Sequence, residues 1–126
     1  MAYDLNAGTI RWKAPLGEDP VAANEGGRDT GILRGGERRS IVVTSTGLLF
    51  VNTKDSKIRA YDADNGKVLW SAALPAGTEG IPAMYEVRGR QYLVVPAASP
   101  QATGRQAYGS SNQISGRAYV AFALPR

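Results

Sequence analysis

The sequence predicts an all-β protein: a partial β-propeller of four-stranded antiparallel blades, with about two blades and part of a third. The pair Ala-Tyr begins at residues 2, 60 and 118, a constant interval of 58 residues. A fixed interval is the signature of repeat architectures, and an ordinary β-sandwich, the alternative fold, has no reason to show one. The 15 glycines and 7 prolines among 126 residues favour many short strands joined by turns.

The first two copies each contain a turn between two strands. Residues 2–16 and 60–74 share seven of fifteen positions. Gly8 and Gly66 fall where the backbone must take a positive φ, which a Cβ would resist. Asp4 and Asp62 stand at the entrance of each loop and can accept hydrogen bonds from backbone N–H groups inside it. Each copy is therefore expected to form a β-hairpin.

A tryptophan follows each turn, in the outer strand of its unit. Simple alternation places Trp12 and Trp70 on the inward face of that strand, and we expect both rings to lie in the core rather than to stack on a ligand. The residues that alternation puts beside them are Ile10, Ala14 and Leu16 in the first copy, and Val68, Ala72 and Leu74 in the second.

The remaining strands follow in order along one domain, residues 1–126. Residues 1–17 supply an outer strand pair, 36–76 a complete blade, and 78–126 three strands of another blade. The complete blade comprises strands at 40–45, 48–53, 57–62 and 67–74, and the last unit contains "IPAMYEV", "RQYLVVPAA" and "RAYVAFAL". Two loops, at about 18–35 and 99–116, lengthen the interval beyond the ~40 to 45 residues of many propeller blades. Helix is expected to be nearly absent.

Nine strands are not a whole number of four-stranded blades, so we expect the chain to be a piece of a longer propeller. Exposed blade faces and unpaired strand edges would then favour self-association. A small binding module that oligomerises is the alternative interpretation.

Composition excludes several kinds of chemistry. Without cysteine or histidine, the chain cannot build a thiolate nucleophile, a disulfide, a Cys/His zinc site or a Ser-His-Asp triad. We predict no catalytic residue and no metal ligand within it. The net charge of +4 and the loop arginines Arg28, Arg34, Arg38 and Arg39 are interpreted as solvated charge, and we expect no nucleic-acid partner. No membrane span or signal peptide is recognisable.

Three segments together resemble a known family. "TKDSKIRAYDADNGKVLWSAALPAG", "IPAMYEVRGRQYLVV" and the terminal "AYVAFALP" are similar to the C-terminal blades of quinoprotein dehydrogenases, which depend on pyrroloquinoline quinone (PQQ). Among these enzymes, the membrane-bound glucose dehydrogenase type is the most similar in sequence. The hairpin motif alone is shared with non-enzymatic PQQ-like repeats, whereas the continuation after it is more specific.

The resemblance implies an eight-bladed periplasmic propeller that holds PQQ and Ca²⁺ on its axis. Such an enzyme oxidises an alcohol or a sugar and passes the electrons to quinone or cytochrome. The resemblance also implies that the catalytic aspartate and most metal ligands lie in earlier blades. We therefore expect this chain by itself to be inactive and to bind neither PQQ nor Ca²⁺. The alternative is a non-catalytic PQQ-like propeller that acts as a scaffold or binding module.

Three residues are candidates for cofactor binding on the strength of this resemblance. Asp55, in the loop after the strand at 48–53, matches an aspartate on the active-site side of the glucose dehydrogenase type. Gly35 and Gly36 match a glycine pair near the cofactor floor. Each can also be an ordinary turn residue. Sugar-oxidising members carry Gly-Gly-His-Gly where this chain has Ala98 to Gln101, which leaves another alcohol or a changed pocket open.

Overall fold

A computed structural model of the chain describes residues 1–31, 41–53, 55–78, 80–98 and 117–124. These residues form three antiparallel sheets and one short helix, α1 (Pro20–Asn24). The two-stranded sheet contains β1 (Ala2–Asp4) and β2 (Thr9–Trp12); the middle sheet β3 (Ile41–Val43), β4 (Leu48–Thr53), β5 (Lys57–Asp62) and β6 (Val68–Ala73); and the last sheet β7 (Ala83–Val87), β8 (Arg90–Ala97) and β9 (Ala118–Ala123).

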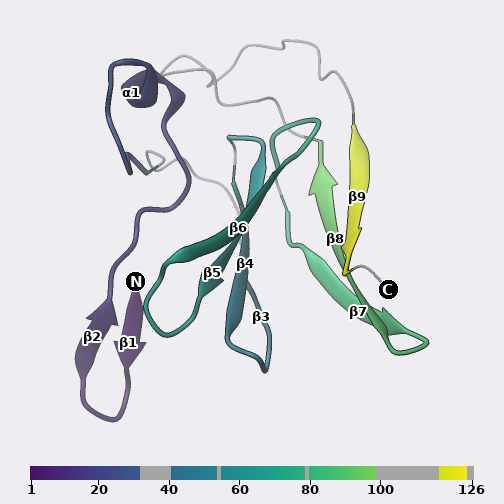
Figure 1. The fold of residues 1–126 in the computed structure, drawn as a ribbon, viewed down its shortest axis with the longest axis horizontal. Helices are drawn as coiled ribbons and strands as arrows, with labels where there is room; N and C mark the ends of the chain where they lie inside the picture. Colours follow the sequence, from purple (N-terminus) through teal and green to yellow (C-terminus); the bar gives the residue numbers. More distant parts are fainter. Residues whose placement is uncertain (32–40, 54, 79, 99–116, 125–126) are drawn as a thin grey trace.

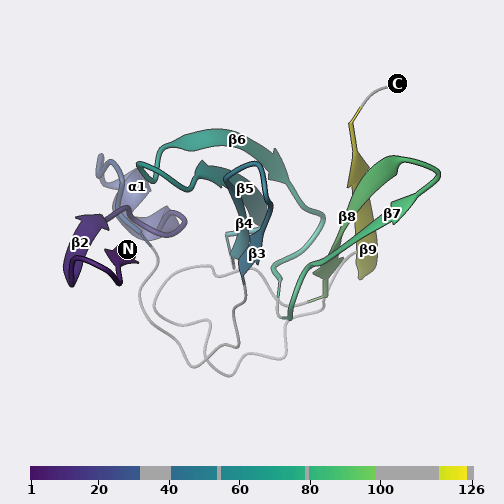
Figure 2. The same ribbon diagram turned by 90° about the horizontal axis from the view of Figure 1, so that it is seen from below.

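The three sheets stand side by side in chain order, with the four-stranded sheet in the middle (Figure 1, Figure 2). Strands that follow one another in the sequence are neighbours in each sheet. The expected distribution of two, four and three strands is confirmed, and so is the all-β fold with propeller blades. Because one sheet cannot cover its own faces, stacking against the next sheet is what buries them.

The first long loop contains the helix. Asp19 caps α1, since its side chain accepts hydrogen bonds from the backbone N–H groups of Val21 (2.9 Å) and Ala22 (3.3 Å). Helix content is low in the described residues, as expected. Gly35 and Gly36, and the second long loop at 99–116, lie outside the described residues.

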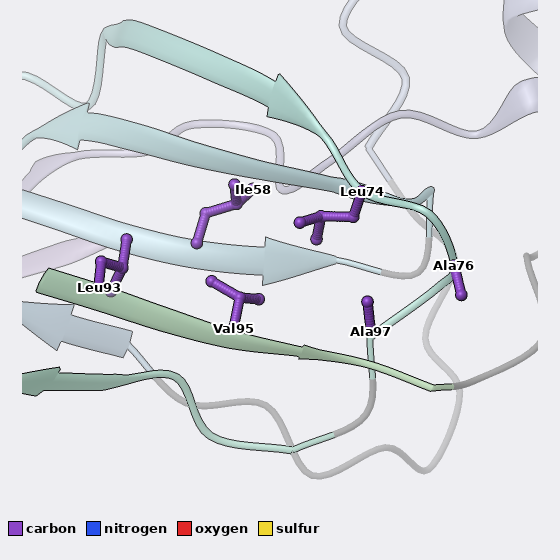
Figure 3. Packing of buried hydrophobic residues seen from close by; sticks show 6 residues of the cluster. All are labelled: Ile58, Leu74, Ala76, Leu93, Val95 and Ala97. Atoms are coloured by element: carbon purple, nitrogen blue, oxygen red, sulfur yellow. The ribbon is translucent and has the colours of Figure 1, made fainter. Parts of the chain in front are cut away.

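The core lies between the middle sheet and the last sheet. Ile58 of β5 and Leu74, just after β6, face Leu93 and Val95 of β8 (Figure 3). The side chains of Ile58 and Val95 are completely buried. Burying a side chain of this size stabilises the fold by about 1.5 to 3 kcal/mol. Contacts between blades, rather than contacts within one blade, therefore form the hydrophobic core.

The outer strands do not alternate as the sequence suggested. Ala60 pairs with Trp70, but Tyr61 pairs with Val68, so Leu69 is an extra residue that forms a β-bulge. Paired residues share a face of the sheet, and a bulge shifts the strand by one residue. Val68 and Trp70 therefore lie on opposite faces, which corrects the expectation that they share one. β2 has the same irregularity between its pairs with Ala2 and Tyr3.

The two tryptophans pack differently. Trp12 is partly buried, its ring lies against Gly66, and its Nε1–H donates to the Ala63 carbonyl oxygen at 2.9 Å. Trp70 packs edge-on against Phe122, with ring centroids 5.3 Å apart, and keeps 40% of its surface exposed. The expectation of a core tryptophan is wrong for Trp70. The physical reason is the kind of contact: Trp70 meets a side chain of strand β9, Phe122, edge-on, whereas Trp12 lies with its ring against the backbone of a turn at Gly66.

Replacing Gly66 by alanine tests the packing of Trp12. An added Cβ would lie 2.5 Å from Trp12 Cε3, and φ at Gly66 is +74°. We expect Gly66→Ala to lower the free energy of unfolding by about 2 to 4 kcal/mol, as measured by urea denaturation. Gly47→Ala is the matched control, because Gly47 has φ +81° and nothing within 4 Å of an added Cβ. It should cost about 1 kcal/mol. Equal losses would contradict the contact.

Candidate functional site

A buried polar cluster lies where β4 ends and β5 begins. The Asp55 carboxylate accepts hydrogen bonds from the Thr53 hydroxyl, from both terminal nitrogens of Arg59, and from the backbone N–H of Glu18. The Arg59 Nη1 to Asp55 Oδ1 distance is 3.1 Å, and the Glu18 N to Asp55 Oδ2 distance is also 3.1 Å. We refer to the side chains of Thr53, Asp55 and Arg59, with the Glu18 N–H, as the Asp55 cluster.

The charges in the Asp55 cluster are shielded from water. The side chains of Arg59 and Asp55 are only 9% and 8% exposed. Burial by itself raises the pKa of Asp55, but hydrogen bonds from Arg59 and Thr53, with the attraction of the Arg59 charge, outweigh burial and hold that pKa below its usual value. Burial likewise lowers the pKa of Arg59, and Asp55 more than restores it, so the net direction is upward. Both groups therefore remain charged.

The Asp55 cluster ties the first part of the chain to the middle sheet. Glu18 follows the outer strand β2, so the bond from its N–H to Asp55 joins neighbouring blades. The Glu18 carboxylate also contacts Lys57 Nζ at 3.4 Å, although both side chains are more than two-fifths exposed. Beside them, the Asp19 N–H donates to Thr30 Oγ1 at 2.9 Å, which closes the loop around α1.

Further buried polar groups lie at the same end of the middle sheet. Asn52 Nδ2 donates to the Gly80 carbonyl oxygen at 3.2 Å, and the Leu74 N–H donates to the Ser56 carbonyl oxygen at 2.7 Å. Ser56 has a φ of +57°, a conformation unusual for a residue with a side chain. The β4–β5 turn and the connection from β6 to β7 thus meet at one end of the middle sheet.

The structure places one of the three candidate cofactor residues. Asp55 lies at this polar end, whereas Gly35 and Gly36 lie outside the described residues. Thr53 and Arg59, the partners of Asp55, were not among the residues predicted from the sequence. A signal was present, because Asp55 lies in a tight turn four residues before Arg59, and Arg59 stands between the apolar residues Ile58 and Ala60. A charge in an apolar strand calls for a partner of opposite sign.

The Asp55 cluster does not fit a metal ion or an acidic cofactor. The described residues contain no group of three or more Asp, Glu, His or Cys side chains that could hold a metal. Ca²⁺ takes six to eight oxygen ligands, and both oxygens of Asp55 already accept hydrogen bonds from this chain. Arg59 is likewise committed to Asp55 and Thr53. We therefore derive no step through a bound metal or quinone.

The chemistry open to Asp55 is that of a fixed charge. A general base needs a pKa near the working pH and a free lone pair facing the proton it removes. Asp55 meets neither requirement, because its pKa is lowered and its oxygens already accept four hydrogen bonds. The carboxylate is suited to hold two segments of the chain in place.

Among the described residues, none of the helical structure has the length and apolar character that a membrane-spanning helix needs.

Comparison with known proteins relates this arrangement to a family. Residues 1–93 match the PQQ family described as the glucose/ethanol/alcohol dehydrogenase β-propeller domain. Quinoprotein glucose dehydrogenase A of Acinetobacter calcoaceticus is 39% identical over 67% of the chain. The glycerol dehydrogenase large subunit of Gluconobacter thailandicus is 38% identical over 76% of the chain, and the 1-butanol dehydrogenase (cytochrome c) of Thauera butanivorans is 35% identical over 66%.

The chain is short beside these relatives. Its matched region corresponds to 10% of the Acinetobacter protein, 14% of the Gluconobacter protein and 12% of the Thauera protein. The similarity therefore concerns a sector of each protein, and the three names differ in the alcohol or sugar that they mention.

Neutralising Asp55 should destabilise the fold more than neutralising a neighbouring exposed carboxylate. In Asp55→Asn, Arg59 stays buried without its counter-charge. We therefore expect the free energy of unfolding to fall by about 3 to 5 kcal/mol. Glu18→Gln is the matched control and should cost less than about 1 kcal/mol, because its pair with Lys57 is exposed. Urea denaturation of both variants measures the difference. Similar losses would show that the Asp55 cluster holds nothing together.

The lowered pKa of Asp55 also predicts an acid-dependent loss of stability. Above the unfolded pKa of about 3.9, both states are ionised and the full stabilisation is present. As the pH falls through that value toward the folded pKa, the unfolded chain takes up a proton that the folded chain does not, so stability declines. The free energy of unfolding measured from pH 6 downward should fall below about pH 4 in the original chain. The decline should be smaller in Asp55→Asn.

Proposed function

Because the chain belongs to the family of PQQ glucose/ethanol/alcohol dehydrogenase β-propeller domains, we propose that it is the C-terminal part of a PQQ-dependent dehydrogenase. The whole enzyme oxidises an alcohol or a sugar, and PQQ with Ca²⁺ supplies the redox chemistry when bound. The observation that carries this proposal is the family match across residues 1–93. The identities of 35% to 39% to three dehydrogenases support it.

Within that enzyme, we propose that the Asp55 cluster positions the loops at one end of the middle blade. Asp55 fixes the backbone at Glu18, and Ser56 receives the N–H of Leu74, so segments on both sides of the blade are fastened to one turn. Asp55 then affects a cofactor through the loops that it holds, because its own oxygens are occupied. Any contact of Gly35 and Gly36 with the cofactor stays part of the proposal and rests on resemblance alone.

The electron acceptor and the compartment are also proposals. The name of the Thauera relative includes cytochrome c, which supports a cytochrome acceptor; quinone is the other candidate that the resemblance implies. A periplasmic location follows from the resemblance only. Self-association of the isolated chain stays a prediction, and the exposed side chains Tyr85, Val87 and Tyr119 on the last sheet are the surface that favours it.

A non-catalytic propeller is the second candidate. The saturated hydrogen bonding of Asp55 favours it, since a scaffold needs fixed loops and no open carboxylate. It differs from the first candidate in requiring no cofactor at all.

A dye-linked assay on the complete protein separates the two candidates. The complete protein is incubated with PQQ and Ca²⁺, and dye reduction is followed with a panel of primary alcohols, polyols and aldoses. We expect reduction that depends on PQQ and on one substrate class, and we expect none from the 126-residue chain assayed in parallel. A complete protein that stays inactive on the whole panel and binds no PQQ would support the scaffold instead.

A further inference from the structure

The turn between β5 and β6 contains the dipeptide Asn65-Gly66, and no other asparagine of the chain is followed by glycine. The side chain of an asparagine can be attacked at Cγ by the backbone nitrogen of the next residue. Glycine favours that attack, because it has no Cβ to obstruct the approach and its backbone is the least restricted. Asn65 is exposed, so water reaches its side chain. Asn65 therefore has the chemical surroundings that spontaneous deamidation needs.

The folded turn holds the groups that would react in hydrogen bonds. Asn65 Nδ2 donates to Asp62 Oδ2 at 2.7 Å, and Asn65 Oδ1 accepts the Lys67 N–H at 2.8 Å. The attacking group, the Gly66 N–H, donates to the Asp62 carbonyl oxygen at 2.8 Å. The attack requires the Gly66 nitrogen to lose its proton and the Asn65 side chain to rotate toward it. Each of these hydrogen bonds opposes one of those changes.

Trp12 covers the same turn. Gly66 is buried although Asn65 is exposed, and an added Cβ at Gly66 would lie 2.5 Å from Trp12 Cε3. The Trp12 Nε1–H also donates to the Ala63 carbonyl oxygen at 2.9 Å. The backbone of the turn cannot rearrange without disturbing these contacts. Local opening of the turn is therefore the event that lets the Gly66 nitrogen meet the Asn65 side chain.

We propose that Asn65 is a site of spontaneous deamidation and that Asp62, by holding the Asn65 amide, sets its rate in the folded chain. The Gly66 nitrogen forms a bond to Asn65 Cγ, its proton passes to Nδ2, and ammonia leaves. Water then opens the cyclic imide at either carbonyl carbon. Opening at the backbone carbon gives isoaspartate, and opening at Cγ gives aspartate. The reaction needs no oxidant or reductant and does not depend on any catalytic activity of the protein.

Either product changes the turn on which Trp12 packs. Isoaspartate routes the main chain through Cβ, which adds an atom to the backbone between Asp62 and Lys67. Aspartate replaces the Nδ2 donor by a carboxylate beside those of Asp62 and Asp64, and like charges at this separation repel one another. Deamidation at this position therefore weakens the contact between the first two sheets.

Peptide mapping by mass spectrometry tests the site on the 126-residue chain. The chain is kept in mildly alkaline buffer, once folded and once in guanidinium chloride, and conversion of each asparagine to aspartate and isoaspartate is followed with time. We expect Asn65 to convert first in the denatured chain. In the folded chain it should convert at a rate at least about tenfold lower. No conversion of Asn65 in the folded chain, or a rate within about tenfold of the denatured one, would reject the proposal.

A matched pair of variants tests the role of Asp62. Asp62→Ala removes the acceptor of the Asn65 amide, and we expect conversion of Asn65 in the folded chain to accelerate at least about fivefold. Asp4→Ala is the control, because Asp4 has the same place in the β1–β2 hairpin, where it accepts the Asn6 and Ala7 N–H groups. It should leave the rate at Asn65 unchanged.

A conservative variant separates the hydrogen bond from general loosening of the turn. Asp62→Asn keeps an acceptor oxygen, so its rate of Asn65 conversion should fall between those of the original chain and Asp62→Ala. Circular dichroism first establishes that each variant is folded, and Asp62→Asn takes the place of Asp62→Ala if the latter is not. A rate at Asn65 no higher than in Asp4→Ala would show that Asp62 does not control the reaction.

Discussion

Packing between neighbouring sheets is the constraint on which this structure depends. Each sheet is too small to cover its own faces, and the completely buried side chains Ile58 and Val95 lie between two sheets rather than within one. The same constraint explains the use of Gly66, where the absence of a Cβ lets the Trp12 ring approach the next blade. Stability in such an array is a sum of contacts between neighbours, so a change at one interface acts locally.

The polar contacts of the Asp55 cluster add direction to this packing. Apolar contacts hold the blades together but fix the loops at their ends poorly, because burial is not directional. The paired charges of Asp55 and Arg59, with the hydrogen bond from Glu18, set where one blade's connection meets the next blade's turn. A buried pair of this kind gives little net stability over an apolar pair of the same shape, yet its loss is costly. That asymmetry suits a part whose task is positioning.

The site was only partly predictable from the sequence. Asp55 was found through resemblance, whereas Arg59 and Thr53 were overlooked. The position of Arg59 in an apolar strand called for a partner, but the sequence does not say which residue supplies it. The bulges at Leu69 and Arg11 were missed for a related reason: an extra residue leaves the sequence alternation looking intact while the register of the strand shifts. The helix α1 is too short to leave a periodic signal.

The sequence by itself determined the strands, the turns and the repeat. Those features depend on neighbours in the chain: a glycine with positive φ, an aspartate that caps its own turn, and a constant interval. Only the tertiary structure decided which faces meet, that Trp12 docks on a turn while Trp70 remains two-fifths exposed, and that Asp55 is saturated by hydrogen bonds. Those outcomes depend on contacts between residues distant in the chain, where burial and register are set by the partner sheet.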